Sequence, residues 1–296
     1  MDAMLSKNDV VKRDNSWLYL LMVIETVIIV VRHASMPDWF DQGYHTFDLI
    51  GKGIVWVTEI CLPLFFILCG YVFFRGIDKK PKPDWFMQRY KSVLLSLVIP
   101  YLIANILSLA VYLLAYKFAP SAMSGFMGDN WKDPLFIFWK GPVNLSLWFL
   151  RELFIICLLS PLIYWLVRYT WGIGVIAVGL LWGFHLVPEP LFWFTLGATP
   201  AILCLHSRRF ETWMARHPVR IAADCPRWCF FTYLYHYLPQ IAMKKVGVAL
   251  LPEINSAGLL AVWICNALIL LGGLSLIYVL LRRFTPKLLS VLAGGS

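Results

Sequence analysis

Charged residues are scarce in this chain, which argues against an ordinary soluble domain. Only 15% of the 296 residues are Asp, Glu, Lys or Arg, whereas soluble domains carry about a quarter. Apolar stretches of about 17 to 25 residues recur, and these are long enough to cross a bilayer as helices. The alternating pattern of outer-membrane barrel strands is absent. The composition therefore predicts an all-α protein, a polytopic transmembrane helix bundle.

Several short motifs of familiar chemistry are also missing. The sequence has no glycine-rich phosphate loop, no His-Glu metal pair on one helix and no nucleophile elbow. The seven cysteines mostly fall inside apolar stretches, where small apolar filler is the simplest interpretation. Cys225 and Cys229 are only a weak metal signal, because no histidine lies near them. We expect neither a metal site nor a disulfide framework.

The net charge of +9 lies mostly in short loops rather than in one basic patch, so membrane lipids and not nucleic acid are the expected partners. Lys and Arg are concentrated before the first span and after the second, sixth and eighth, which places both termini in the cytoplasm. The fifth and sixth spans are short, and a re-entrant pair is the alternative for them. The eight expected spans are residues 17–34, 54–74, 93–116, 146–168, 171–187, 189–206, 228–249 and 257–281.

Ionisable side chains gather near the expected outer ends of several spans. At a rise of about 1.5 Å per residue, His33 lies roughly 24 Å above Trp17 and so near the outer face. A carboxylate beside an imidazole raises its basicity and fixes its tautomer, as a general base requires. The alternative is that these charges only neutralise one another and fix helix packing. The residues expected in this layer are His33, Glu59, Arg151, Glu152 and His185.

Two further groups are candidates for a site. Glu25 and His236 lie at similar depths in their spans and could pair. Arg89 and Lys91 stand at the cytoplasmic mouth of the third span, where they could bind phosphate groups of a donor. Charge that only sets the membrane topology is the alternative for this basic pair.

Six segments that follow one another along the chain match a known pattern. Each is weak alone, but the ordered set spans most of the chain and resembles the acyltransferase-3 family of integral membrane acyltransferases. The resemblance extends over residues 1–296 as a single domain. The segments are VVRH (30–33), PLFFILCGY (63–71), RYK (89–91) leading into IPY (99–101), LWFLREL (147–153), FTLG (194–197) and FTYLYH (231–236).

This resemblance implies transfer of an acyl group, commonly acetyl, from cytoplasmic acyl-CoA to a hydroxyl of a cell-surface glycan or lipid-linked sugar. It implies a multi-pass protein of the plasma membrane, which is the inner membrane in bacteria. It identifies His33 as the catalytic histidine. In the mechanism that we expect, Glu152 or Glu59 orients this imidazole. Arg32 or Arg151 would then stabilise the oxyanion. The residues expected on the donor side are Arg89, Lys91, His236 and Trp148.

The chain departs from the family pattern at three places, of which Cys69, where a serine is often found before Gly70, is a small conservative change. The family commonly has an arginine eleven residues before the histidine, and that position is Met22 here. It also has further spans where residues 207–227 form only a short basic loop, so the chain resembles a shortened member. A glycan or lipid transporter and a catalytically inactive member remain the alternative functions. The acceptor, the acyl chain and formation of a homo-oligomer are left open.

Overall fold

The computed structural model describes residues 16–77, 83–118, 142–203, 205, 217, 219–251 and 253–294. Within these ranges every regular element is helical, which confirms the predicted all-α class. Four helices are long and apolar enough to cross a membrane, namely Ser16–Ala34, His45–Phe74, Asp84–Phe118 and Ser256–Phe284. A fifth is added if Leu145–Leu158 and Ser160–Tyr169, bent by 59°, form one span.

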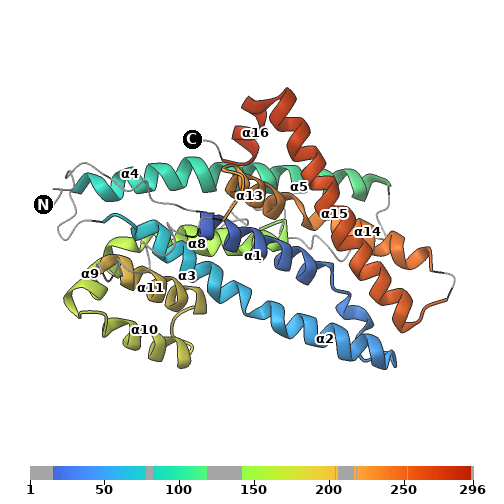
Figure 1. Cartoon of the computed structure of the whole chain (residues 1–296), viewed down its shortest axis with the longest axis horizontal. Coiled ribbons are helices and arrows are strands. Elements are labelled where there is room, and N and C mark those ends of the chain that lie inside the picture. The colour runs from blue at the N-terminus through green and yellow to red at the C-terminus, as the bar shows by residue number, and fades with distance from the viewer. Residues whose placement is uncertain are drawn as a thin grey trace, which may run out of the picture.

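The helices that contain these spans run mostly along the long axis of the molecule (Figure 1). A π-helix, η2, joins α4 to α5. The elements in chain order are α1 (Ser16–Ala34), η1 (Pro37–Trp39), α2 (His45–Glu59), α3 (Cys61–Phe74), α4 (Pro83–Val93), η2 (Leu94–Val98), α5 (Ile99–Phe118), η4 (Leu145–Leu147), α8 (Trp148–Leu158), α9 (Ser160–Tyr169), α10 (Gly174–Gly183), α11 (Glu189–Ile202), α13 (Cys225–Tyr235), α14 (Tyr237–Ala249), α15 (Ser256–Phe284) and α16 (Pro286–Leu292).

The expected count of eight spans is not confirmed. The segments at 171–187 and 189–206 contain α10 and α11, which have 10 and 14 residues. At about 1.5 Å per residue such helices are shorter than the hydrocarbon core of about 30 Å. The segment at 228–249 is divided at His236 into α13 and α14.

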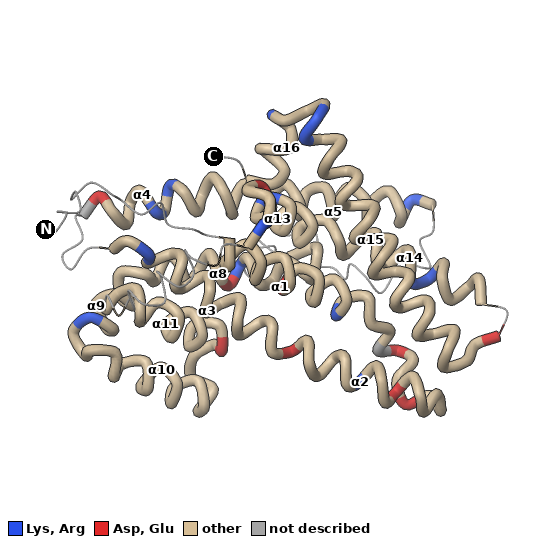
Figure 2. The backbone as a smooth tube through the Cα atoms, in the orientation of Figure 1, with Lys and Arg blue, Asp and Glu red and all other residues tan. Residues whose placement is uncertain are grey.

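The cytoplasmic location of both termini stays a prediction. Many of the basic residues on which it depends lie outside the described residues, in the ranges 1–15, 78–82 and 206–216. Charged residues are sparse along the long helices (Figure 2). Asp48, which the sequence places in an external loop, lies on α2 instead. Near it, Lys52 donates a hydrogen bond of 2.6 Å to Asp41.

Helices α3 and α11 make the most extensive contact among the described helices, and two glycines allow it. A Cβ atom on Gly70 would collide with the backbone carbonyl oxygen of Phe194. A Cβ atom on Gly197 would likewise collide with the carbonyl of Ile67. Small residues let helix backbones approach one another in a membrane. Helix α11 also contacts α8 and α9, so the contact with α11 places α3 on the same side of the bundle as those two helices.

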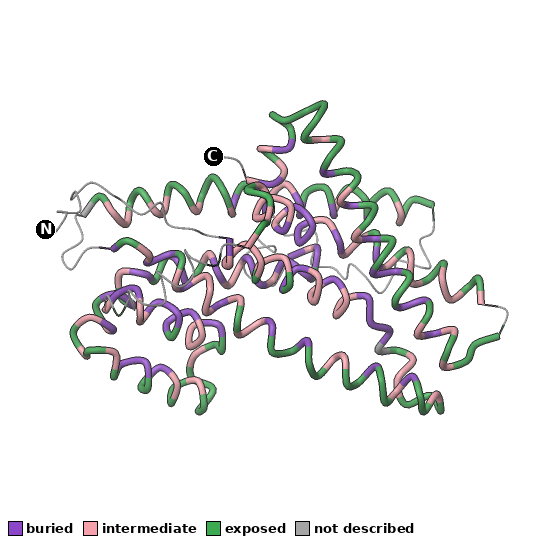
Figure 3. The backbone as a smooth tube through the Cα atoms, viewed as in Figure 1, coloured by how far each residue is buried: buried purple, intermediate pink, exposed green. Residues whose placement is uncertain are grey.

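An aromatic core fills the space between α3, α8 and α13. The ring of Phe149 lies 4.4 Å from that of Phe66 and 4.6 Å from that of Phe65, between centroids. The outer helix faces are exposed (Figure 3), and on α5 they carry Ile106 and Leu114. Apolar side chains on such faces fit contact with lipid rather than with water.

Candidate functional site

The end of α1 carries Arg32 and His33, and side chains from α14 and α15 hold it. Gln240 Nε2 donates a 2.8 Å hydrogen bond to the Val30 carbonyl, and Trp263 Nε1 donates one of 2.8 Å to that of Val31. Lys244 Nζ donates to the carbonyls of His33 at 3.2 Å and Ser35 at 3.0 Å. Carbonyls in the last turn of a helix lack partners within the helix. These contacts therefore fix the position of the His33 backbone.

A cavity of about 440 Å³ lies beside this helix end. It combines one imidazole, two cations, one carboxylate and two aromatic rings. The residues that give it this character are Arg32, His33, Glu59, Trp148, Tyr237 and Lys244. The structure thus brings four of the sequence-predicted residues together, and it places Trp148 with His33 rather than with Arg89.

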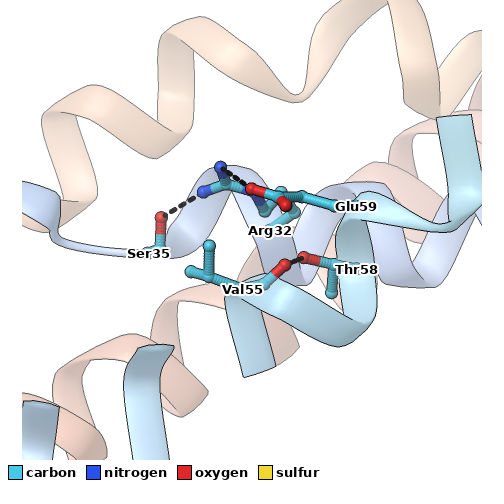
Figure 4. Close-up of polar contacts among 5 residues, drawn as sticks. All are labelled: Arg32, Ser35, Val55, Thr58 and Glu59. Carbon is cyan, nitrogen blue, oxygen red and sulfur yellow. Dashed lines mark hydrogen bonds and ion pairs between the residues drawn. The ribbon is translucent and has the colours of Figure 1, made fainter. Parts of the chain in front are cut away.

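Arg32 and Glu59, which both line this cavity, lie next to each other and point toward one another (Figure 4). Arg32 Nη2 lies 3.8 Å from Glu59 Oε1, and Arg32 Nη1 donates to Ser35 Oγ at 3.5 Å. The side chains are 37% and 63% exposed, so the pair is open to the surroundings of the protein. Glu59 therefore engages Arg32, and it does not form an ion pair with His33.

His33 has a second imidazole as its neighbour. The ring centroids of His33 and His236 are 5.1 Å apart, and that of Tyr237 lies 5.8 Å from His33. His236 is completely buried at the junction of α13 and α14. Its Nδ1 lies 2.8 Å from the Tyr233 carbonyl, and a carbonyl can only accept, so Nδ1 carries the proton. Its Nε2 is consequently an acceptor in the neutral ring, and it has no hydrogen-bond partner among the described residues.

Glu152 and Arg151 do not join the His33 cavity. Arg151 Nη2 lies 2.7 Å from Glu152 Oε1, and the two side chains are only 20% and 18% exposed. Trp148, one turn earlier on α8, is the residue of this helix that reaches the cavity. Glu152 and His33 are expected at equal depth, but they make no contact, because Glu152 is paired with Arg151.

His185 is also apart from this cavity. It lies exposed just after α10, in a left-handed backbone conformation with φ of 56°. Helix α10 packs on α9 and α11. The single layer of five ionisable residues expected from depth is therefore divided between His33 with Glu59, the Arg151–Glu152 pair and His185.

A second cavity, of about 240 Å³, lies between α1, α3, α4 and η2. Arg89 lines it, together with Met22, Glu25 and Cys69. The Arg89 guanidinium lies over the Trp85 ring, 5.1 Å from its centroid, and donates to the Arg75 carbonyl at 3.0 Å. Lys91 is exposed and does not line this cavity. The expected basic pair therefore contributes one residue, Arg89, to a concave site.

Glu25 is a buried carboxylate in this second cavity. It is 3% exposed, and within the described part of the chain its Oε2 atom has no hydrogen-bond partner. The pair with His236 suggested by equal depth is not formed, because Glu25 faces the Arg89 cavity while His236 lies against His33. An unpaired buried polar atom is costly, which marks this position for a ligand or a missing partner.

A third and larger cavity, of about 940 Å³, adjoins the Arg89 cavity. The two share Met22, Phe65, Cys69 and Ser96 in their linings. The larger one also reaches Arg227 and the ion pair of Arg282 with Asp224, whose atoms are 2.5 Å apart. The space at Arg89 is thus continuous with a basic opening.

Sequence reasoning missed Tyr237 and Lys244, both of which line the His33 cavity. Lys244 lies inside the expected span 228–249, and a lysine within a span is a functional signal by the rule that singles out Arg32. Tyr237 carries no such signal, because tyrosine is common at span ends.

The described cysteines give no support to a paired site. Cys225 and Cys229 are free, as are Cys61, Cys69, Cys157 and Cys265, and Cys204 lies outside the described residues. Within the part of the chain that the structure describes, no three His, Cys, Asp or Glu side chains are grouped as a metal site would need.

Comparison with known families gives one match. Residues 15–203 match the model of an acyltransferase domain, that of the acyltransferase-3 family. This range covers more than half of the chain and includes His33, Arg89 and Glu152, but His236 and Lys244 lie beyond it. No curated protein and no solved structure matches the chain.

Proposed function

The chain belongs to the acyltransferase-3 family of membrane acyltransferases, and on that basis we propose that it transfers an acyl group, acetyl in the first instance, from acyl-CoA to a hydroxyl of a cell-surface glycan or lipid-linked sugar. The observation that carries the proposal is the pair of cavities that lie about one helical turn apart along α1 and α3. One contains a histidine with polar and aromatic neighbours, and the other opens between basic residues.

The donor side of the proposal rests on Arg89. Guanidinium groups bind phosphate oxygens through several hydrogen bonds, and Arg89 stands beside a cavity otherwise lined mainly by apolar side chains. Arg227 supplies further positive charge at the adjoining cavity, whereas the charge of Arg282 is met by Asp224. A CoA molecule has phosphates at one end and a narrow pantetheine arm at the other, which suits a basic opening followed by an apolar passage.

The acceptor side of the proposal rests on the His33 cavity. Trp148 and Tyr237 provide aromatic faces, and Arg32 and Glu59 provide hydrogen-bonding groups. Aromatic faces beside polar groups suit the apolar and hydroxyl faces of a sugar ring. His33 is the only imidazole among the residues lining this cavity, so it is the proposed general base.

The two cavities are separated by about one helical turn. On α1, Glu25 lines the donor cavity and Ile29 lines the His33 cavity, a distance along the helix of about 6 Å. On α3, Phe65 lines the donor cavity and Leu62 lines the His33 cavity. To reach His33, the thioester would therefore have to pass about one helical turn beyond the donor cavity.

In the proposed reaction His33 takes the proton of the acceptor hydroxyl while the oxygen attacks the thioester carbonyl. Glu59 is the carboxylate of this cavity, and it acts by holding Arg32 in place. The reaction needs no metal. The protein would act in the plasma membrane, the inner membrane of bacteria, with the acceptor at the outer face. Eight spans with both termini in the cytoplasm would satisfy this arrangement.

The test is acetyl transfer by the purified full-length chain in mixed micelles. Acetyl-CoA is the donor, and octyl β-glucoside, which carries sugar hydroxyls on an apolar chain, is the acceptor probe. Mass spectrometry detects the acetylated glucoside, and thiol release gives the rate. We expect His33→Ala to lower kcat by about 10²-fold or more. Equal turnover by the wild type and His33→Ala would reject His33 as the base.

A further inference from the structure

Lys244 is the most firmly held cation of the His33 cavity, and its role can be inferred from its contacts. Its Nζ donates to the carbonyls of His33 and Ser35 at 3.2 and 3.0 Å. An ammonium group has three N–H donors, so these carbonyls leave one donor over. Among the described residues Lys244 has no ion-pair partner, and Asp38 acts on it only from a longer distance.

The other cations near the site are engaged elsewhere. Arg32 is shared between Glu59 and Ser35. Arg151 is bound to Glu152 and does not line the cavity. Lys244 is therefore the positive charge in this cavity that no carboxylate neutralises at short range, and it is held by the backbone that also carries His33.

Resting on the proposed function, we propose that Lys244 binds the oxyanion that forms during acyl transfer. The acceptor oxygen forms a bond to the thioester carbonyl carbon as its proton moves to the His33 imidazole. The electron pair of the carbonyl double bond moves onto the carbonyl oxygen. This oxygen accepts a hydrogen bond from the third N–H of Lys244. When the carbonyl forms again, the carbon–sulfur bond breaks, and the sulfur leaves with the bonding electrons and takes the proton from His33.

The location of Lys244 suits this role for two reasons. Its donors are fixed before the reaction by two backbone carbonyls, and fixed charges stabilise a transition state without the cost of reorganisation. It also stands at the C-terminal end of α1, where the helix dipole favours a positive charge. The same contacts couple the cation to His33, so that base and oxyanion site move as one unit.

The experiment compares variants of Lys244 with a matched control in the octyl glucoside assay. Lys244→Gln is decisive, because an amide still donates to the carbonyls but carries no charge. We expect it to lower kcat by about 10²-fold with a KM for acetyl-CoA close to that of the wild type. Lys244→Arg should restore most of the activity, and Lys245→Met, which removes the neighbouring exposed charge, should stay within about twofold of the wild type.

The outcomes separate this inference from the proposed function. A folded Lys244→Gln variant with the turnover of the wild type, alongside an inactive His33→Ala, overturns the role of Lys244 alone. A wild type that binds acetyl-CoA but transfers acetyl neither to octyl glucoside nor to water overturns both proposals. Thermal unfolding of each variant shows that it is folded, and a drop in kcat in Lys244→Arg equal to that in Lys244→Gln would indicate a purely structural role.

Discussion

The imidazoles of His33 and His236 lie 5.1 Å apart between centroids, and the buried Nε2 of His236 is an acceptor without a partner. We expect His236→Phe, which keeps a ring but removes both nitrogens, to lower kcat by about 10²-fold. The reason is that the His33 imidazole would lose His236 Nε2, the neighbouring acceptor available for its N–H. Tyr235→Phe is the control, because the Tyr235 hydroxyl bonds to the Leu292 carbonyl away from this cavity. Turnover unchanged in a folded His236→Phe would contradict the prediction.

The Arg151–Glu152 pair should support the fold rather than the chemistry at His33. Removing one partner of a largely buried ion pair strands the other charge, at a cost of about 3 kcal/mol or more. We therefore expect Glu152→Gln to lower the unfolding temperature by several degrees, measured by circular dichroism in detergent. Arg151→Met with Glu152→Met should regain most of the loss, because neither charge is then stranded.

Activity separates the two roles of Glu152. The double variant has no carboxylate at position 152, so it should keep its turnover per folded molecule if Glu152 only pairs with Arg151. A stable double variant without activity would instead show that Glu152 or Arg151 takes part in the reaction, as the sequence pattern suggests.

The contact between α3 and α11 depends on the absence of side chains at Gly70 and Gly197. Either Gly→Ala change would push a methyl group against a backbone carbonyl, which cannot turn away. We expect each to destabilise the fold by about 1–3 kcal/mol, seen as a lower thermal midpoint in detergent. Gly272→Ala on α15 is the control, because nothing lies within 4 Å of the added Cβ, and it should be neutral or stabilising.

The limits of sequence reasoning are visible in the histidine and its expected partners. Hydrophobic length predicts a first span over residues 17–34, and α1 ends at Ala34 as expected. Depth along a helix could not predict partners, because it leaves open which face each residue presents. Glu152 thus lies at a suitable depth but pairs with Arg151. Glu25 also lies at a suitable depth but faces the Arg89 cavity. The break at His236 lies inside the single span expected at 228–249, where Pro239 in the first turn of α14 is the sequence signal for a helix boundary.

Arg89 and Lys91 should differ in their effect on donor binding. Arg89 lines the second cavity, whereas Lys91 is exposed on α4. We expect Arg89→Gln to raise the KM for acetyl-CoA by about tenfold, as loss of a charge-assisted hydrogen bond predicts. Lys91→Gln should raise it by less than threefold. Isothermal calorimetry with CoA measures the same difference without turnover, and equal losses for both variants would argue against the cavity as the donor site.

Met22 and Glu25 stand one turn apart on α1 and line the same cavity, where the family pattern commonly has an arginine at position 22. We expect Met22→Arg to raise the unfolding temperature, because a guanidinium would pair with the Glu25 carboxylate that now has an unpaired oxygen. It should also tighten CoA binding by adding a cation to the donor cavity. Met22→Leu, which changes shape but not charge, should do neither.

The partner variant decides whether Glu25 is the cause. In Met22→Arg with Glu25→Gln the added charge has no carboxylate to meet, so the gain in unfolding temperature should disappear. CoA binding should then tighten further, because the guanidinium is free to meet phosphate. A Met22→Arg variant that is destabilised as much as the double variant would show that the cavity cannot accept an arginine, and the methionine would then be part of how this chain packs.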